Sequence, residues 1–142
     1  MIRAMIRQAV LLVCLAGAAA AQEMTSAPGG LIRVLDKLTG VVADFDLARG
    51  QSQSLGRLTV LLDECRYPTE DPAAEAAAHL TVTDSLLTTA AFSGWMIASS
   101  PALSALDHPR YDVWVLACDY PRPDPSDEPE PAPEATTDAE GQ

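Results

Sequence analysis

The chain has 142 residues and a formal net charge of −11, because 20 Asp and Glu residues face only nine Lys and Arg. Nucleic acid and anionic lipid headgroups repel such an acidic chain, so we expect neither as a direct partner. A cationic protein surface is compatible with this charge. The length suffices for one domain with one modest hydrophobic core.

Residues 1–21 are predicted to be a secretory signal peptide. Arg3 and Arg7 give a positive start, residues 9–18 are apolar, and Ala19-Ala20-Ala21 offers the small residues that a signal peptidase accepts. The apolar run is too short for a transmembrane helix, which needs about 20 residues. An uncleaved anchor and a lipoprotein attached through Cys14 are the alternatives. A cleaved signal predicts a periplasmic protein with seven cations against 20 acids, a balance of −13.

Export determines how the two remaining cysteines are interpreted. Cys65 and Cys118 are the only cysteines after the signal, and in an oxidising compartment we expect a disulfide between them. It would close a loop of about 54 residues, which contributes roughly 4 kcal/mol in the chain-entropy model. A redox or metal pair is the alternative, and two distant cysteines without a CxxC motif do not favour it.

The first part of the mature chain is predicted to be a linker that leads into strands. Residues 22–30 are rich in Ser, Pro and Gly and form the expected linker, and a β domain is predicted over residues 31–118. Its first segment, residues 31–38, is apolar with interspersed charge. Residues 41–47 alternate apolar and polar side chains with a period of two, which predicts a half-buried strand.

Two further strands and a loop follow the second Gly-containing turn. Residues 51–55 are a short strand candidate, and residues 58–65 are a stronger one with Leu61 and Cys65 on the same face. Residues 67–78 contain two prolines and an alanine-rich stretch that is too short for an independent helix, so they are predicted to be a loop.

The last part of the domain combines strands with one short helix. Residues 80–87 and 88–98 are predicted strands, and the second is expected to be central because it is apolar on both faces near Trp95. Ser100 before Pro101 is typical of an N-cap, so a helix is predicted over residues 100–106. Residues 111–118 form the last strand, with Trp114 and Cys118 on one face.

The predicted fold class is therefore all-β. About seven short antiparallel strands form a small sandwich or a partly open barrel with one short helix. Residues 119–142 hold six prolines, eight acids and one arginine, and they are predicted to be a disordered acidic tail because they cannot bury enough apolar surface. This tail is expected either to solubilise the protein or to reach a basic partner.

The most unusual stretch is residues 92–115, FSGWMIASSPALSALDHPRYDVWV. Together with LDKLTG at residues 35–40 and the two cysteines, it resembles a family of exported alphaproteobacterial proteins that is classified as a domain of unknown function. An aromatic residue is expected in that family where Ile97 stands. The resemblance implies export, a small β domain and a cysteine pair, but no reaction. Genes of the family often neighbour a gene for an accessory subunit of respiratory complex I, although neighbouring genes do not establish contact.

We predict no catalytic, cofactor or metal site. Ser99 or Ser100 with His108 and Asp112 would supply the residue types of a hydrolase triad, but no GxSxG or SxxK motif accompanies them. His79 and His108 are the only histidines, too few ligands for a metal. His108 is instead expected to be a turn residue that bonds the backbone.

The leading hypothesis is a non-catalytic periplasmic protein that binds another envelope protein, as an accessory or assembly component of a membrane complex. A loop on a rigid β scaffold often carries binding, and the aromatic residues nearby belong either to the core or to an exposed patch. The alternatives are a cell-wall or glycan binder and a serine-dependent hydrolase. The predicted partner-binding residues are Trp95, Ser99, Ser100, Leu103, His108, Arg110 and Tyr111.

Overall fold

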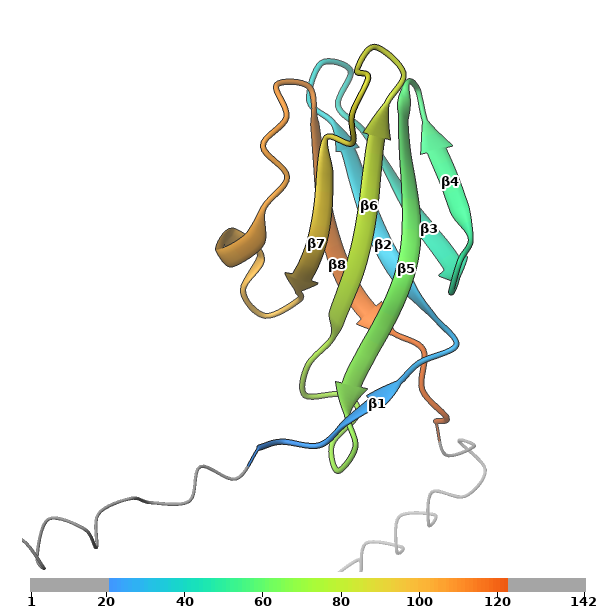
Figure 1. Cartoon of the computed structure of the whole chain (residues 1–142), viewed down its shortest axis with the longest axis vertical. Coiled ribbons are helices and arrows are strands. Elements are labelled where there is room, and N and C mark those ends of the chain that lie inside the picture. The colour runs from blue at the N-terminus through green and yellow to red at the C-terminus, as the bar shows by residue number, and fades with distance from the viewer. Residues whose placement is uncertain (1–20, 123–142) are drawn as a thin grey trace, which may run out of the picture.

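The computed structural model describes residues 21–122, which fold into a sandwich of two antiparallel β-sheets (Figure 1). Residues 1–20 of the predicted signal peptide and residues 123–142 of the predicted tail lie outside the described part. No helix within residues 21–122 has the length and apolarity that a membrane crossing requires.

One sheet has five strands and the other has three. In the first, β5 pairs with β6 and β6 with β7, while β1 and β4 pair with opposite ends of the other edge of β5. In the second, β2 lies between β3 and β8. The strands are β1 (Met24–Ser26), β2 (Gly29–Asp36), β3 (Val41–Ala48), β4 (Ser52–Leu55), β5 (Leu58–Pro68), β6 (Ala77–Asp84), β7 (Phe92–Ile97) and β8 (Tyr111–Cys118), and one turn of 3₁₀ helix is η2 (Pro101–Ser104).

The predicted all-β antiparallel fold is confirmed, with eight strands in place of about seven and no closed barrel. The additional strand lies in the predicted linker, where β1 pairs with the end of β5. Gly29 and Gly30 of that linker begin β2. Both are packed so closely that a side chain at either position would collide with its neighbours. A Cβ at Gly30 would lie 2.9 Å from the Cys65 sulfur, and one at Gly29 would lie 2.5 Å from the Leu47 carbonyl oxygen.

The hydrophobic core lies between the sheets and comes from alternate residues of six strands. Phe45 and Leu47 of β3 are buried, as their period of two predicts. The largest fully buried side chains are Tyr111, Phe45, Ile32, Leu47, Leu58, Leu62, Leu80, Val34, Val60 and Val82.

The alternation is interrupted in each of the two strands that carry a cysteine. In β5, Leu62 is buried and a register shift before Glu64 turns Cys65 inward three residues later. In β8, Val115 is buried, the pairing with β2 shifts, and Cys118 is inward three residues later. Such β-bulges insert one residue and reverse the faces that follow.

The bulges correct two predictions about shared faces. Leu61 does not share a face with Cys65, since it is only partly buried while Leu62 and Cys65 are fully buried. Trp114 does not share a face with Cys118. It pairs across the sheet with Arg33 on the outer surface of the three-stranded sheet.

The predicted disulfide between Cys65 and Cys118 is confirmed. The two Cα atoms are 5.6 Å apart, and both residues are buried. Because β5 and β8 belong to different sheets, this bond crosslinks the two layers of the sandwich.

The segment before β8 differs from the predictions in the position of its strand and in the length and capping of its short helix. The strand β7 is not central, because it stands at the end of its sheet's strand order, next to β6. The helix is one 3₁₀ turn that begins at Pro101. The Ser100 side chain forms no capping hydrogen bond, whereas the Ser100 carbonyl accepts one from the Leu103 amide.

Candidate functional site

Three hairpin turns and the end of the longest connection meet at one end of the sandwich, at the top of Figure 1. We call this the loop end. It contains residues 37–40 between β2 and β3, 56–57 between β4 and β5, 85–91 between β6 and β7, and 105–110 before β8, together with the strand residues that flank these turns, which are Asp36, Val41, Val42, Asp84 and Tyr111. The disulfide and β1 lie toward the opposite end.

Asp36 fixes the turn between β2 and β3. Its buried carboxylate accepts a hydrogen bond from the Leu38 amide at 3.0 Å. It also accepts bonds from Arg110, at 3.0 Å from Nε and 2.6 Å from Nη2. The Arg110 guanidinium lowers the pKa of Asp36 to about 2 and so keeps this buried carboxylate charged.

Asp84 fixes the turn between β6 and β7 in the same way. Its carboxylate is buried and accepts bonds from the Leu86 amide at 2.9 Å, from Arg57 Nε at 2.7 Å and from His108 Nε2 at 3.0 Å. Burial opposes its charge, but these donors outweigh that effect and lower the pKa of Asp84 below its ordinary value. Asp84 therefore joins three segments that are distant in the sequence.

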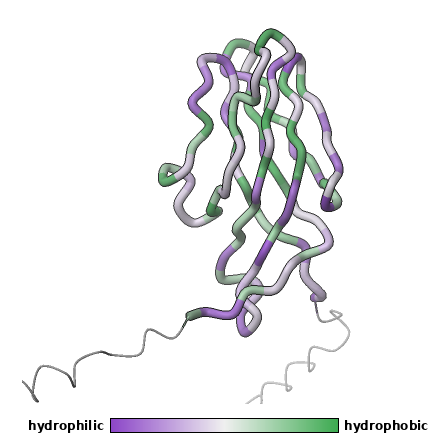
Figure 2. Tube along the Cα trace, in the orientation of Figure 1, coloured by the Kyte–Doolittle hydropathy of each residue, from purple (hydrophilic) through white to green (hydrophobic). Residues whose placement is uncertain are grey.

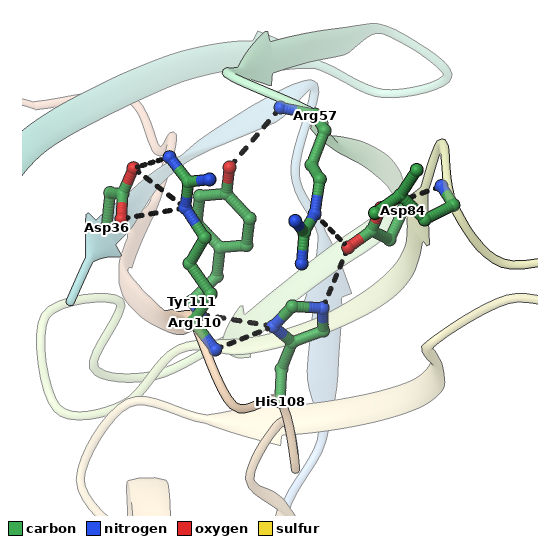
Figure 3. A network of polar contacts seen from close by, with 7 residues as sticks. Asp36, Arg57, Asp84, His108, Arg110 and Tyr111 are labelled. Carbon is green, nitrogen blue, oxygen red and sulfur yellow. Dashed lines mark hydrogen bonds and ion pairs between the residues drawn. The ribbon is translucent and has the colours of Figure 1, made fainter. Parts of the chain in front are cut away.

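His108 and Tyr111 lie between these two carboxylates (Figure 3). His108 Nδ1 accepts the amides of Arg110 and Tyr111, both at 3.1 Å, so the ring proton is on Nε2 and faces Asp84. The prediction that His108 bonds the backbone in a turn is thus confirmed.

The Tyr111 ring is fully buried and lies between two guanidinium groups in Figure 3. The guanidinium carbons of Arg57 and Arg110 are 5.9 Å and 5.1 Å from the ring centroid, within range of a cation–π contact. The Tyr111 hydroxyl accepts the Arg57 amide at 3.3 Å.

The two turns are built alike from two short Asp-x-Leu sequences. Each aspartate bonds the amide two residues later, as in an Asx turn, and each bonds one of the arginines beside Tyr111. Each leucine, Leu38 and Leu86, then projects into solvent. Their exposed fractions are 75% and 71%.

Exposed apolar side chains gather at the loop end. Figure 2 shows hydrophobic colouring at the tips of its turns. Within residues 21–122, five of the nine large exposed hydrophobic residues lie here, and they are Leu38, Val41, Val42, Leu86 and Leu87. A rigid polar layer therefore supports an apolar tip.

The structure divides the sequence-predicted binding residues into two groups. His108, Arg110 and Tyr111 are part of the loop end, where the first and last are buried and hold its turns. Trp95, Ser99, Ser100 and Leu103 lie away from it. Trp95 is on the outer surface of β7, with the Arg66 guanidinium carbon 4.9 Å from its ring centroid and the His79 ring edge-on to it at 5.4 Å.

The hydroxyl–imidazole pair of a hydrolase is not formed by these residues. The Ser99 hydroxyl donates to the Glu75 carboxylate, which also accepts the Ser99 amide at 3.1 Å. Burial opposes the charge of Glu75, but these bonds leave its pKa below the ordinary value. Both nitrogens of His108 are already bonded. Among the described residues, no three His, Cys, Asp or Glu side chains group as metal ligands do.

Sequence reasoning missed Arg57 and the leucines of the loop end. Leu38, Leu86 and Leu87 carry a signal in the sequence, because turns prefer Gly, Asn, Asp and Ser and an exposed leucine there is unusual. Arg57 carries none, since its partner Asp84 is 27 residues away.

A family model described as an uncharacterized protein conserved in bacteria (DUF2155) matches residues 30–118. The chain belongs to this family. The DUF2155 match covers β2 to β8 and therefore includes the whole loop end and both cysteines. The family resemblance identified from the sequence is confirmed.

An uncharacterized protein of Rickettsia prowazekii (strain Madrid E), an alphaproteobacterium, is 26% identical over 99 residues. The alignment covers 68% of this chain, and the chain spans 64% of that relative's length. No solved structure matches the chain significantly.

Proposed function

We propose that this DUF2155 protein is a non-catalytic periplasmic protein that binds another envelope protein through its loop end, as an accessory or assembly component of a membrane complex. The observation that carries the proposal is that Leu38 and Leu86 are exposed on turns whose aspartate anchors are buried. Apolar groups gathered on the surface of a folded domain are typical of interaction sites.

The rigidity beneath the leucines supports the same function. Binding by a flexible loop loses conformational entropy, whereas turns that are already fixed lose little. Here each of the two leucine turns is held by a buried aspartate. The carboxylate accepts hydrogen bonds from the backbone amide of the leucine and from an arginine side chain. The energy of burying the leucines is then available for affinity.

Export is part of the proposal and has two supports. The first 21 residues have the composition of a signal peptide, and the Cys65–Cys118 disulfide is a bond that persists in oxidising compartments. Both fit a partner in the envelope.

The test is co-purification from the native host with full-length protein tagged at its C-terminus. We expect Leu38→Ser/Leu86→Ser/Leu87→Ser to recover at least about tenfold less of the specific membrane partner than the unmodified chain, since central apolar anchors carry most of the energy of an interface. The matched control is Leu103→Ser, because Leu103 on η2 is 78% exposed but lies away from the loop end.

The outcomes separate the two candidate surfaces. Normal recovery with Leu103→Ser and loss with the triple variant support the loop end. Loss with Leu103→Ser alone would place binding on the η2 segment and overturn the proposed site. Absence of any stoichiometric partner would overturn the function.

A further inference from the structure

A hollow of about 340 Å³ opens at the loop end beside the exposed Leu38. It is lined by Lys37, Leu38, Arg57, Pro109 and Arg110. Three of these five residues are cations, although the chain as a whole carries a net charge of −11.

The two arginines of this hollow are partly exposed, while the carboxylates that pair with them are buried. The Arg57 side chain is 31% exposed and that of its partner Asp84 is 2% exposed. For Arg110 and Asp36 the fractions are 29% and 6%. In these two pairs an approaching group therefore meets guanidinium before it meets carboxylate, whereas Lys37 already pairs with the partly exposed Asp112.

Both arginines have donors that no group within residues 21–122 accepts. Arg57 bonds Asp84 only through Nε, which leaves Nη1 and Nη2, and Arg110 bonds Asp36 through Nε and Nη2, which leaves Nη1. In Figure 3 the Nη atoms of Arg57 point away from Asp84, toward Tyr111 and Arg110. The cation–π contacts with Tyr111 hold both guanidinium groups in place.

We propose that this hollow binds a carboxylate, supplied by a glutamate or aspartate side chain of the partner protein. Guanidinium groups with a fixed orientation match the two oxygens of a carboxylate and form charge-assisted hydrogen bonds. Leu38 and Pro109 give the hollow an apolar rim, so the acid is expected to stand beside an apolar residue. This inference rests on the proposed function and specifies what the partner presents.

The probe is the peptide acetyl-Leu-Glu-Leu-amide, with acetyl-Leu-Gln-Leu-amide as its match without charge. In NMR titrations of the mature full-length protein, we expect saturable shifts at the amides of Leu38, Arg57 and Arg110. The glutamine peptide should bind about tenfold more weakly, which corresponds to the loss of one charge-assisted hydrogen bond.

Substitution of arginine by lysine keeps the charge and removes the planar fork. Arg57→Lys should lower the affinity for the glutamate peptide about tenfold. Arg33→Lys should leave binding unchanged, because the Arg33 fork is already bonded to Asp44 on the outer face of the three-stranded sheet.

Several results would overturn the inference. One such result is equal affinity for the glutamate and glutamine peptides. Another is that inorganic phosphate binds as tightly as the glutamate peptide, which would indicate unselective attraction of anions. A further variant has the Asp and Glu residues of 124–142 replaced by Asn and Gln. If this variant binds the peptide more tightly, the chain's own tail is the occupant. If the leucine variant loses the partner but the peptide does not bind, the proposed function stands and the carboxylate site does not.

Discussion

At the scale of single residues, the loop end depends on two aspartates that remain charged although they are buried. Each has an amide donor two residues later and an arginine, and Asp84 has His108 as well. Hydrogen bonds to the charged form lower the pKa of a carboxyl group, and a lowered pKa links folding to pH. The polar layer should therefore weaken in acid.

Asp36→Asn tests this link. The pKa of Asp36 falls from 3.8 to about 2 on folding, mainly through its hydrogen bonds with Arg110. A lowered pKa contributes stability that is present above the unfolded value and is lost as the pH falls through the folded value. We expect the variant to be less stable at neutral pH and the difference to narrow steadily from pH 3.8 toward about 2, as measured by urea unfolding across this range.

Asp44→Asn is the control for that experiment, because Asp44 also pairs with an arginine but on the open surface. Exposed pairs add little to stability, so we expect a small effect. A difference in the free energy of unfolding between Asp36→Asn and the unmodified protein that stays the same at every pH would contradict the assignment.

Some of this chemistry was available in the sequence and some was not. The bond of His108 to the backbone of its turn followed from its position before Pro109. The repeated Asp-x-Leu at residues 36–38 and 84–86 is visible as well, but it becomes a signal only when both turns lie at one end. The pairing of Arg57 with Asp84 depends on the register of β5 with β6, which local sequence does not determine.

At the scale of elements, the period of two predicted the strands well and failed where a strand contains a bulge. In residues 41–47 the predicted inward residues Phe45 and Leu47 are buried and Ala43 is partly buried, whereas Val41 at the start of β3 is exposed. In β5 and β8 the cysteine lies three residues after a buried Leu62 or Val115. An uninterrupted period of two would place residues three apart on opposite faces, yet both are buried. The sequence contains no local marker for either bulge, since the shift is a property of pairing with a neighbouring strand.

The turn between β4 and β5 depends on Gly56. Its φ is +59°, and a Cβ there would lie 2.6 Å from the Tyr111 hydroxyl oxygen. Gly56→Ala combines backbone strain with displacement of Tyr111, so we expect the free energy of unfolding to fall by about 2–4 kcal/mol.

Gly40→Ala separates these two contributions. Gly40 has a φ of +74° but open space around its Cβ position, so only backbone strain is expected, at about 1 kcal/mol. Urea unfolding of both variants measures the difference. Equal losses would show that the close approach of Gly56 to Tyr111 does not matter for stability.

At the scale of the whole molecule, the two sheets are fastened differently at their two ends. A covalent bond between β5 and β8 crosslinks them near one end, and the hydrogen bonds of Tyr111 with Arg57 and of His108 with Asp84 join them at the other. Both ends of the described part of the chain lie at the bottom of Figure 1, at the end of the sandwich opposite the loop end.

This division predicts that the disulfide serves stability and not binding. Its two cysteines are 53 positions apart, so the chain-entropy model gives a contribution of about 4 kcal/mol, a large part of the 5–15 kcal/mol typical of a small domain. We expect Cys65→Ala/Cys118→Ala to shift the urea midpoint down accordingly, while glutamate-peptide shifts at Leu38 stay unchanged at low temperature without urea. Because both cysteines are buried, the native unmodified protein should also resist alkylation until it is unfolded and reduced. Loss of the peptide shifts in a variant that remains folded would show instead that the two ends are coupled through the core.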